Sequence, residues 1–145
     1  MTESEERAKD WLNRNFWMSF EIAAIKRRLE RMESNIEKVC KPIRLKEVQE
    51  GHGDGNSQEN LMAEYLDLAA EIERRELILE QRDKETAAVI DKVESPILRT
   101  ILIERYINRL IWRDICEAIH LEKSRMLELH LQALSAVVPY IPERM

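Results

Sequence analysis

The side chains most often used in catalysis or metal binding are scattered through this sequence. Cys40 and Cys116 have no further ligands at metal-binding spacing and lie in apolar stretches, so we expect buried thiols. His52 and Asp54 are two weak ligands in a glycine-rich stretch, which predicts solvated side chains rather than a metal site. The sequence has no phosphate-binding glycine loop and no nucleophile with a histidine at motif spacing. We therefore expect no enzyme, no cofactor and no metal.

The remaining chemistry is electrostatic, and the charge is uneven along the chain. The whole sequence has 23 Lys and Arg against 28 Asp and Glu, a net charge of −5, and residues 1–95 carry the excess of acid. From Pro96 onward basic residues slightly outnumber acidic ones, which leaves a local contact with DNA open. Four arginines in this part could contact flanking phosphates: Arg99, Arg105, Arg109 and Arg113. Arg105 could instead form an ion pair with Asp114 or Glu117 within the domain.

These residues must be positioned by helices, because glycine and proline are rare and apolar residues recur at helical spacing. Thr2 and Glu5 match a capping box, and a heptad-like pattern then predicts one helix that ends near Pro42, with Asn15 at one seam position. The apolar seam of this helix consists of Trp11, Met18, Ile22, Ile25, Leu29, Met32, Ile36 and Val39.

A second long helix follows a segment that holds all three glycines, EGHGDGNSQEN, which predicts a mobile loop at about 43–57. Ser95 can cap the next helix and Pro96 can occupy its first position, so the second helix should end there. The two helices should form an antiparallel hairpin over residues 1–94, each about 35 residues and about 50 Å long. The second seam consists of Leu61, Tyr65, Leu68, Ile72, Leu79, Thr86, Val89 and Val93.

A bare hairpin leaves apolar residues off these seams without cover. Self-association of the long helices into a four-helix homodimer is the simplest cover. The alternative is that the C-terminal helices fold back over the hairpin. The off-seam residues are Trp17, Phe20, Leu66, Leu77 and Ile78.

Residues 95–145 are expected to form a three-helix helix-turn-helix domain, which makes the whole chain all-α. We expect helices at 96–107, 112–119 and 124–138, with His120 in a left-handed conformation at the turn. Trp112 should pack beneath the turn, and His130 should lie on an exposed or half-buried flank of the last helix. On the facing sides of the last two helices, Ile115, Cys116 and Ile119 should contact Met126, Leu129, Ala133 and Leu134, and Leu121 should fill the turn.

The run ERYINRLIWRDICEAIHLEKSRMLELHLQALSAV is similar to the region-4 helix-turn-helix of sigma factors. More closely, VIDKVESPILRTILIERYINRLIWRDI together with LHLQAL resembles small phage and prophage regulators of the RinA/ArpU type. The resemblance covers about residues 60–138, and its motif elements are ERY at 104–106, WRDI at 112–115 and LHLQAL at 129–134. It implies a transcriptional regulator of phage genes that binds promoter DNA and often acts with RNA polymerase. The sequence itself has no secretory signal pattern and no apolar run as long as a membrane span, so we expect a protein of the bacterial cytoplasm without a membrane segment.

The resemblance also makes the last helix the recognition helix. Its implied base-reading positions are Lys123, Ser124, Leu127 and Glu128, with Arg125 and Gln132 nearby and Arg109 and Arg113 beside the site. Because Glu122 and Glu128 offset Lys123 and Arg125, this helix is near neutral. An alternative therefore stays open, in which the sigma-like fold is a protein-interaction module that binds polymerase or a sigma factor without reading DNA.

Overall fold

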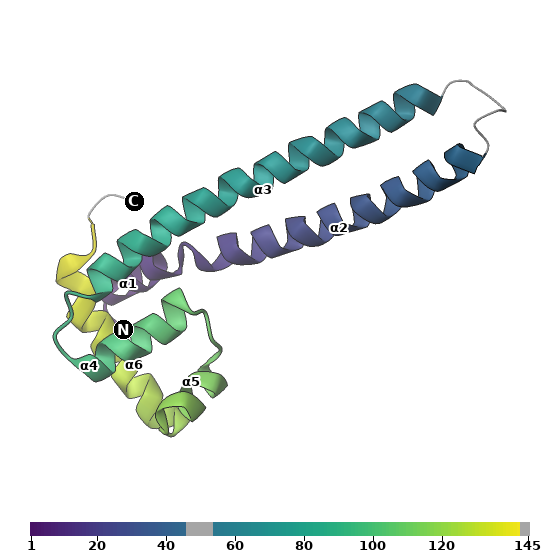
Figure 1. The fold of residues 1–145 in the computed structure, drawn as a ribbon. Coiled ribbons are helices and arrows are strands. Elements are labelled where there is room, and N and C mark those ends of the chain that lie inside the picture. The colour runs from purple at the N-terminus through teal and green to yellow at the C-terminus, as the bar shows by residue number, and fades with distance from the viewer. Residues whose placement is uncertain (46–53, 143–145) are drawn as a thin grey trace. The chain divides into compact units, whose positions relative to one another are not determined.

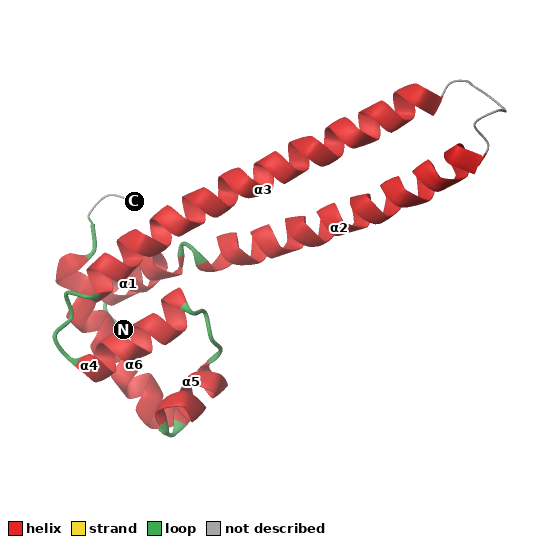
Figure 2. Ribbon diagram, viewed as in Figure 1, coloured by secondary structure: helices red, strands yellow, loops and turns green. Residues whose placement is uncertain are grey.

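The computed structural model describes residues 1–45 and 54–142, with side chains at 1–39 and 57–142. Every regular element in these ranges is a helix, so the predicted all-α fold is confirmed (Figure 1, Figure 2). No helix in the described ranges is long and apolar enough to cross a membrane. In chain order the elements are α1 (Glu3–Asn13), α2 (Phe16–Leu45), α3 (Asp54–Ile90), α4 (Pro96–Leu102), the π-helical turn η1 (Ile103–Ile107), α5 (Trp112–Ile119), α6 (Lys123–Val137) and the 3-10 turn η2 (Val138–Tyr140).

The chain divides into two compact units. The first consists of Met1–Met18 and Leu79–Met145, and the second of Ser19–Ile78. The predicted division between residues 94 and 95 falls inside the first unit, because α1 and the end of α3 share a core with the C-terminal helices. Buried residues of this core are Ala8, Trp11 and Leu12 from α1, Val89 and Ile90 from α3, Val93 after it, Leu102 and Tyr106, and Ala133, Leu134 and Val137 from α6.

The first helix begins as predicted but ends early. The Thr2 hydroxyl accepts a hydrogen bond from the Glu5 N–H at 3.1 Å, and Glu5 Oε1 accepts one from the Thr2 N–H at 2.9 Å, which completes the capping box. The prediction of one helix as far as Pro42 is wrong, because α1 ends at Asn13 and α2 begins at Phe16 and passes Pro42. The fully buried Asn15 in the break donates to Asp83 Oδ1 at 3.1 Å.

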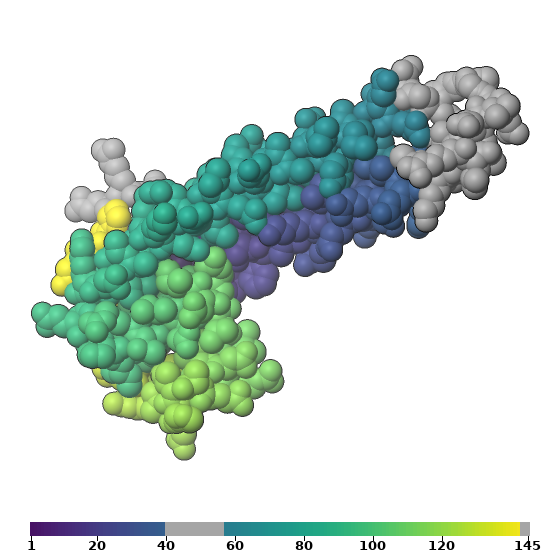
Figure 3. Space-filling view, viewed as in Figure 1, coloured from purple at the N-terminus to yellow at the C-terminus, as the bar shows by residue number. Residues whose placement is uncertain are grey.

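The second unit is the antiparallel hairpin. Glu21 pairs with Arg75 at 2.6 Å and Tyr65 donates to Glu33 at 2.7 Å, so a step forward along α2 matches a step back along α3. The side chains of the two helices meet along the hairpin (Figure 3). The predicted loop at about 43–57 is too wide, since α2 reaches Leu45 and α3 starts at Asp54. Its centre and the position of His52 lie outside the described residues.

The C-terminal helices follow the predicted order. Ser95 Oγ accepts from the Leu98 N–H at 3.4 Å, with Pro96 at the start of α4. The predicted helix at 96–107 is not a regular α-helix throughout, because the chain continues after α4 as the wider turn η1, where the Asn108 N–H donates to the Ile103 carbonyl at 2.9 Å.

The turn between α5 and α6 has the backbone conformation that the sequence predicted. Between α5 and α6, His120 has φ 57° and ψ 47°, the left-handed conformation expected there. Leu121, Cys116 and Ile119 are partly buried against the core of this pair, as the sequence predicted. The buried members of this core are Ile101, Ile115, Met126 and Leu129.

Candidate nucleic-acid interface

The exposed face of α6 holds most of the predicted site. The buried stripe of this helix, which includes Met126, Leu129 and Ala133, packs against the domain core. The remaining positions must then face away from the core, as helical periodicity requires. The predicted residues that are exposed together on this side are Lys123, Ser124, Arg125, Leu127, Glu128 and Gln132.

The charges on this face are few and accessible. Arg125 Nη1 lies 3.2 Å from Glu128 Oε1, and both side chains are more than half exposed. An exposed pair of this kind contributes at most about 1 kcal/mol, so a phosphate could replace the glutamate as partner. At the start of α5 the Arg113 side chain is 80% exposed, and its Nε lies 3.9 Å from Asp114 Oδ1. Lys123, Arg125 and Arg113 are therefore available to an anion.

Two leucines lie on the same face. Leu127 and Leu131, one helical turn apart, are 40% and 41% exposed. A leucine can contact a thymine methyl group in the major groove, but exposed apolar side chains are equally suited to a protein partner. The exposed side of α6 therefore holds two apolar side chains beside Glu128 and Gln132, with its cations at the N-terminal end.

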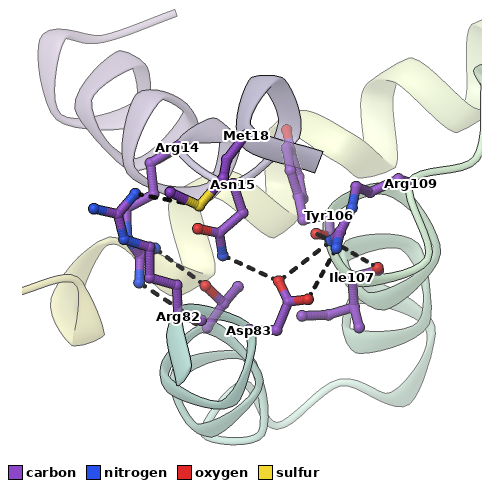
Figure 4. A network of polar contacts seen from close by, with 9 residues as sticks. Arg14, Asn15, Met18, Arg82, Asp83, Tyr106, Ile107 and Arg109 are labelled. Carbon is purple, nitrogen blue, oxygen red and sulfur yellow. Dashed lines mark hydrogen bonds and ion pairs between the residues drawn. The ribbon is translucent and has the colours of Figure 1, made fainter. Parts of the chain in front are cut away.

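Arg109 does not belong to this face. Its Nη2 donates to Asp83 Oδ2 at 2.9 Å and its Nη1 to Asp83 Oδ1 at 3.2 Å, and Nη1 also reaches the Ile107 carbonyl at 2.9 Å. The side chain is only 18% exposed, and Figure 4 shows Asp83 between Arg109 and Asn15. The guanidinium is therefore engaged inside the first unit, and we leave Arg109 out of the proposed DNA contacts.

Two of the other arginines are also engaged within the fold. Arg99 donates to the carbonyls of Val93 and Glu94 at 2.7 and 3.0 Å. Arg105 donates to the Leu110 carbonyl at 3.0 Å, and its guanidinium lies 4.6 Å from the centre of the Trp112 ring. The predicted alternative for Arg105, a pair with Asp114 or Glu117, is not what the structure shows.

Sequence reasoning missed the polar network at the α1–α2 break. Arg14 bonds Thr86 Oγ1 and Glu85 Oε1, both at 3.1 Å, and burial lowers the pKa of its guanidinium despite the nearby Glu85. The Oδ1 atom of Asn15 is buried with no hydrogen-bond partner in the structure. The one signal in the sequence was a polar residue, Asn15, at an apolar seam position.

His130 also differs from its prediction. It is 5% exposed rather than on an exposed or half-buried flank, because its ring packs against η1 and α5. Tyr106 Oη lies 2.7 Å from Nε2, and the Trp112 ring meets the imidazole edge-on at 4.6 Å. Burial, with added repulsion from Lys9 and Arg105, lowers the pKa of His130 to about 4. Burial also raises the pKa of Tyr106. Both rings are therefore neutral at physiological pH.

A family model described as "Protein of unknown function (DUF1492)" matches residues 38–137. The match covers more than half of the chain, so the protein belongs to this family. No curated protein and no solved structure matches the chain. Within the described residues there is also no group of three or more His, Cys, Asp or Glu side chains that could hold a metal ion. Function must therefore be argued from the α5–α6 pair.

Proposed function

We propose that this DUF1492 protein is a DNA-binding transcriptional regulator of the RinA/ArpU type, which places α6 against promoter DNA and acts there with RNA polymerase. The observation that carries the proposal is the joint between α5 and α6. A left-handed His120 joins an eight-residue helix to a longer one. The longer helix presents Lys123, Ser124 and Gln132 on its exposed side, which is how a recognition helix presents side chains to the major groove.

The available charge predicts weak binding by one copy. Lys123, Arg125 and Arg113 can neutralise only a few phosphates, so binding releases few counterions from the DNA. Because counterion release provides much of the free energy of DNA binding, the affinity of one copy should be low. Two copies in one dimer would place two such faces on the same DNA, and the second contact would then be intramolecular. Useful affinity therefore depends on dimerisation.

The second unit supports a homodimer through the long helices. Although α2 and α3 face each other along the hairpin, Ile22 and Ile72 are the only buried apolar residues of the second unit among those whose side chains are described. Leu66 and Leu77 are exposed, and most of the two seams is half-buried. A two-helix hairpin cannot bury these residues by itself, whereas a second hairpin in a four-helix arrangement would.

The test is a titration of the full chain against labelled DNA from upstream of its own gene cluster, at several salt concentrations. Changing Lys123 and Arg125 together to Ala should weaken binding and make the slope of log affinity against log salt shallower by roughly 0.9 for each lost phosphate contact. Glu128→Lys should strengthen nonspecific binding, because it removes a local repulsion.

The matched control removes two exposed cations elsewhere, Arg74 and Lys84 on α3, which are each paired with a nearby glutamate. This double alanine variant should keep the wild-type slope. Equal losses in both double variants would show that binding follows net charge rather than the α6 face, and would contradict the proposal.

The second candidate is a protein-interaction module that binds RNA polymerase or a sigma factor without reading DNA. The exposed pair Leu127 and Leu131 favours it, because apolar residues in the middle of a near-neutral face suit a protein better than a phosphate backbone. Purified bacterial RNA polymerase, with and without sigma factor, provides the test. Capture that Leu127→Ser with Leu131→Ser abolishes, together with undetectable DNA binding at low salt, would favour this candidate.

A further inference from the structure

A pocket lies in the first unit where α1, η1, α5 and α6 meet. Its volume is about 290 Å³, close to the lower end of small-molecule sites, and enough for a single aromatic ring with one polar group. Its wall includes Lys9 from α1, Arg105 from η1, Trp112 from α5, and Leu127, His130 and Leu131 from α6. Nothing in the proposed contact with DNA uses Lys9, Arg105 or His130.

The charge around the pocket is positive and not neutralised. Lys9 and Arg105 both line it, and no Asp or Glu does, although acidic residues outnumber basic ones in the chain, 28 to 23. In the described ranges neither cation forms an ion pair. The Arg105 guanidinium donates to the Leu110 carbonyl and lies over the Trp112 ring, which leaves its charge uncompensated. Such a pocket favours an anion.

The rest of the wall is aromatic and aliphatic. Trp112 and Tyr106 line it together with Leu127 and Leu131. His130 and Tyr106 are both buried, and a hydrogen bond of 2.7 Å joins Tyr106 Oη to His130 Nε2. This part of the pocket wall is therefore formed in the absence of a ligand. A flat apolar body could therefore pack against these rings while its charged group meets Lys9 and Arg105.

We propose that this pocket binds a small organic anion with an aromatic body, an aromatic carboxylate being the simplest example. Because Leu127 and Leu131 line the pocket and also belong to the exposed face of α6, an occupant would cover part of that face. A bound anion would then weaken DNA contact at α6. This last consequence rests on the proposed function, whereas binding of the anion does not.

The test compares benzoate with benzamide, which has nearly the same shape and no charge. Each is titrated into the full-length protein without DNA, and the indole N–H signal of Trp112 is followed by NMR after assignment with Trp112→Phe. We expect a saturable shift with benzoate and binding of benzamide about tenfold weaker, the effect of losing a charge-assisted contact. Equal affinity for the two, or no saturable shift with benzoate, would overturn the proposal.

Variants separate the two parts of the site. Lys9→Gln should weaken benzoate severalfold and leave benzamide unchanged, while Leu131→Ser should weaken both. The control is Lys84→Gln, which removes an exposed cation of the same unit that does not line the pocket. If Lys9→Gln binds benzoate as the wild type does, the anion site is not there. Failure of DNA binding with benzoate selectivity retained would overturn the proposed function alone.

Discussion

The neutral imidazole of His130 links α6 to η1 at the wall of the pocket. His130 is buried beside Tyr106 and Trp112, and the nearest charges that act on it are the cations Lys9 and Arg105. Protonation would place a third positive charge in this site without a carboxylate to compensate it, and burial makes that more costly. The ring therefore acts as a hydrogen-bonding partner of Tyr106, and its protonation works against the folded state.

The stability of the protein should fall as the pH falls from about 6.5 to about 4. The pKa of His130 is lowered from its ordinary 6.5 to about 4 in the folded chain, so in this window the unfolded chain binds a proton that the folded chain lacks. The contribution of neutral His130 to the free energy of unfolding is fully present above pH 6.5. It decreases by up to about 1.4 kcal/mol for each unit by which the pH falls within this window. Urea unfolding followed by circular dichroism at pH 7 and pH 5 measures it.

His130→Gln should flatten this dependence, because an amide can hydrogen-bond Tyr106 but does not titrate. His120→Asn is the matched control, since it removes an exposed histidine and retains a residue that tolerates the left-handed conformation. If both variants lose stability toward acid as the wild type does, other groups cause the loss.

The Asp83 carboxylate ties the η1–α5 connection to α3. Arg109 itself has a positive φ of 59°, an unusual conformation for a residue other than glycine, which its bidentate contact with Asp83 helps to hold. A double-mutant cycle with Arg109→Gln and Asp83→Asn should give a coupling free energy of about 1–3 kcal/mol, as for other partly buried charged hydrogen bonds.

The exposed pair Arg125 and Glu128 provides the comparison for that cycle. Its coupling should be below about 0.5 kcal/mol, because both side chains are open to solvent. Equal coupling in the two cycles would mean that the Arg109–Asp83 contact does not hold the connection. Both cycles are read from urea unfolding of the full chain.

At the scale of the helices, the elements that the sequence predicted are those with local causes. The capping box at Thr2, the Ser95 cap and the left-handed His120 each depend on residues within a few positions, and all are found in the structure. The break at Arg14 and Asn15 has a distant cause. Because Asn15 donates to Asp83, 68 positions away, no apolar spacing around it could indicate where α1 ends.

The wider turn η1 escaped prediction for a related reason. A π-helical turn accommodates one additional residue without removing the apolar pattern, so its sequence still resembles an α-helix. Its effect is on position, since η1 carries Arg105 and Tyr106 toward Trp112 and His130. The pocket wall that η1 forms could therefore not be predicted from the sequence. The exposed side of α6 could be predicted, because it follows from helical periodicity alone.

The left-handed conformation of His120 predicts how substitutions at this position change the free energy of unfolding. His120 is held at φ 57°, which costs a residue with a Cβ atom roughly 1 kcal/mol relative to glycine. His120→Gly should therefore leave the free energy of unfolding unchanged or raise it by up to about 1 kcal/mol. His120→Ile should lower it by about 1–2 kcal/mol, since a branched Cβ tolerates this conformation least. Urea unfolding checks both, and a stable isoleucine variant would contradict the assigned turn.

At the scale of the whole chain, each unit carries a different part of the proposed function. The first unit closes a core around α1, the end of α3 and the C-terminal helices, so the α5–α6 pair packs within it. The second unit has long helices held by ion pairs such as Lys26–Glu76 but few buried apolar residues. Sequence periodicity predicted the hairpin, but it could not predict that α1 joins the first unit, because that depends on contacts far apart in the chain.

The final prediction concerns the partner of the hairpin. Light scattering of the full chain at roughly tens of micromolar should give the mass of two copies. Changing Ile25 and Leu29 to Asp should give the mass of one, because unpaired carboxylates cannot be buried where the two hairpins meet. Ser34→Asp with Asn35→Asp adds the same charge at exposed positions of α2 and should remain a dimer. Unchanged signals of Trp112 would show that the first unit stays folded in both variants. If the wild-type chain is monomeric at these concentrations, only one α6 face can contact a given DNA molecule. Three accessible cations per copy would then be too few for useful affinity, and the proposed DNA binding by a dimer would be contradicted.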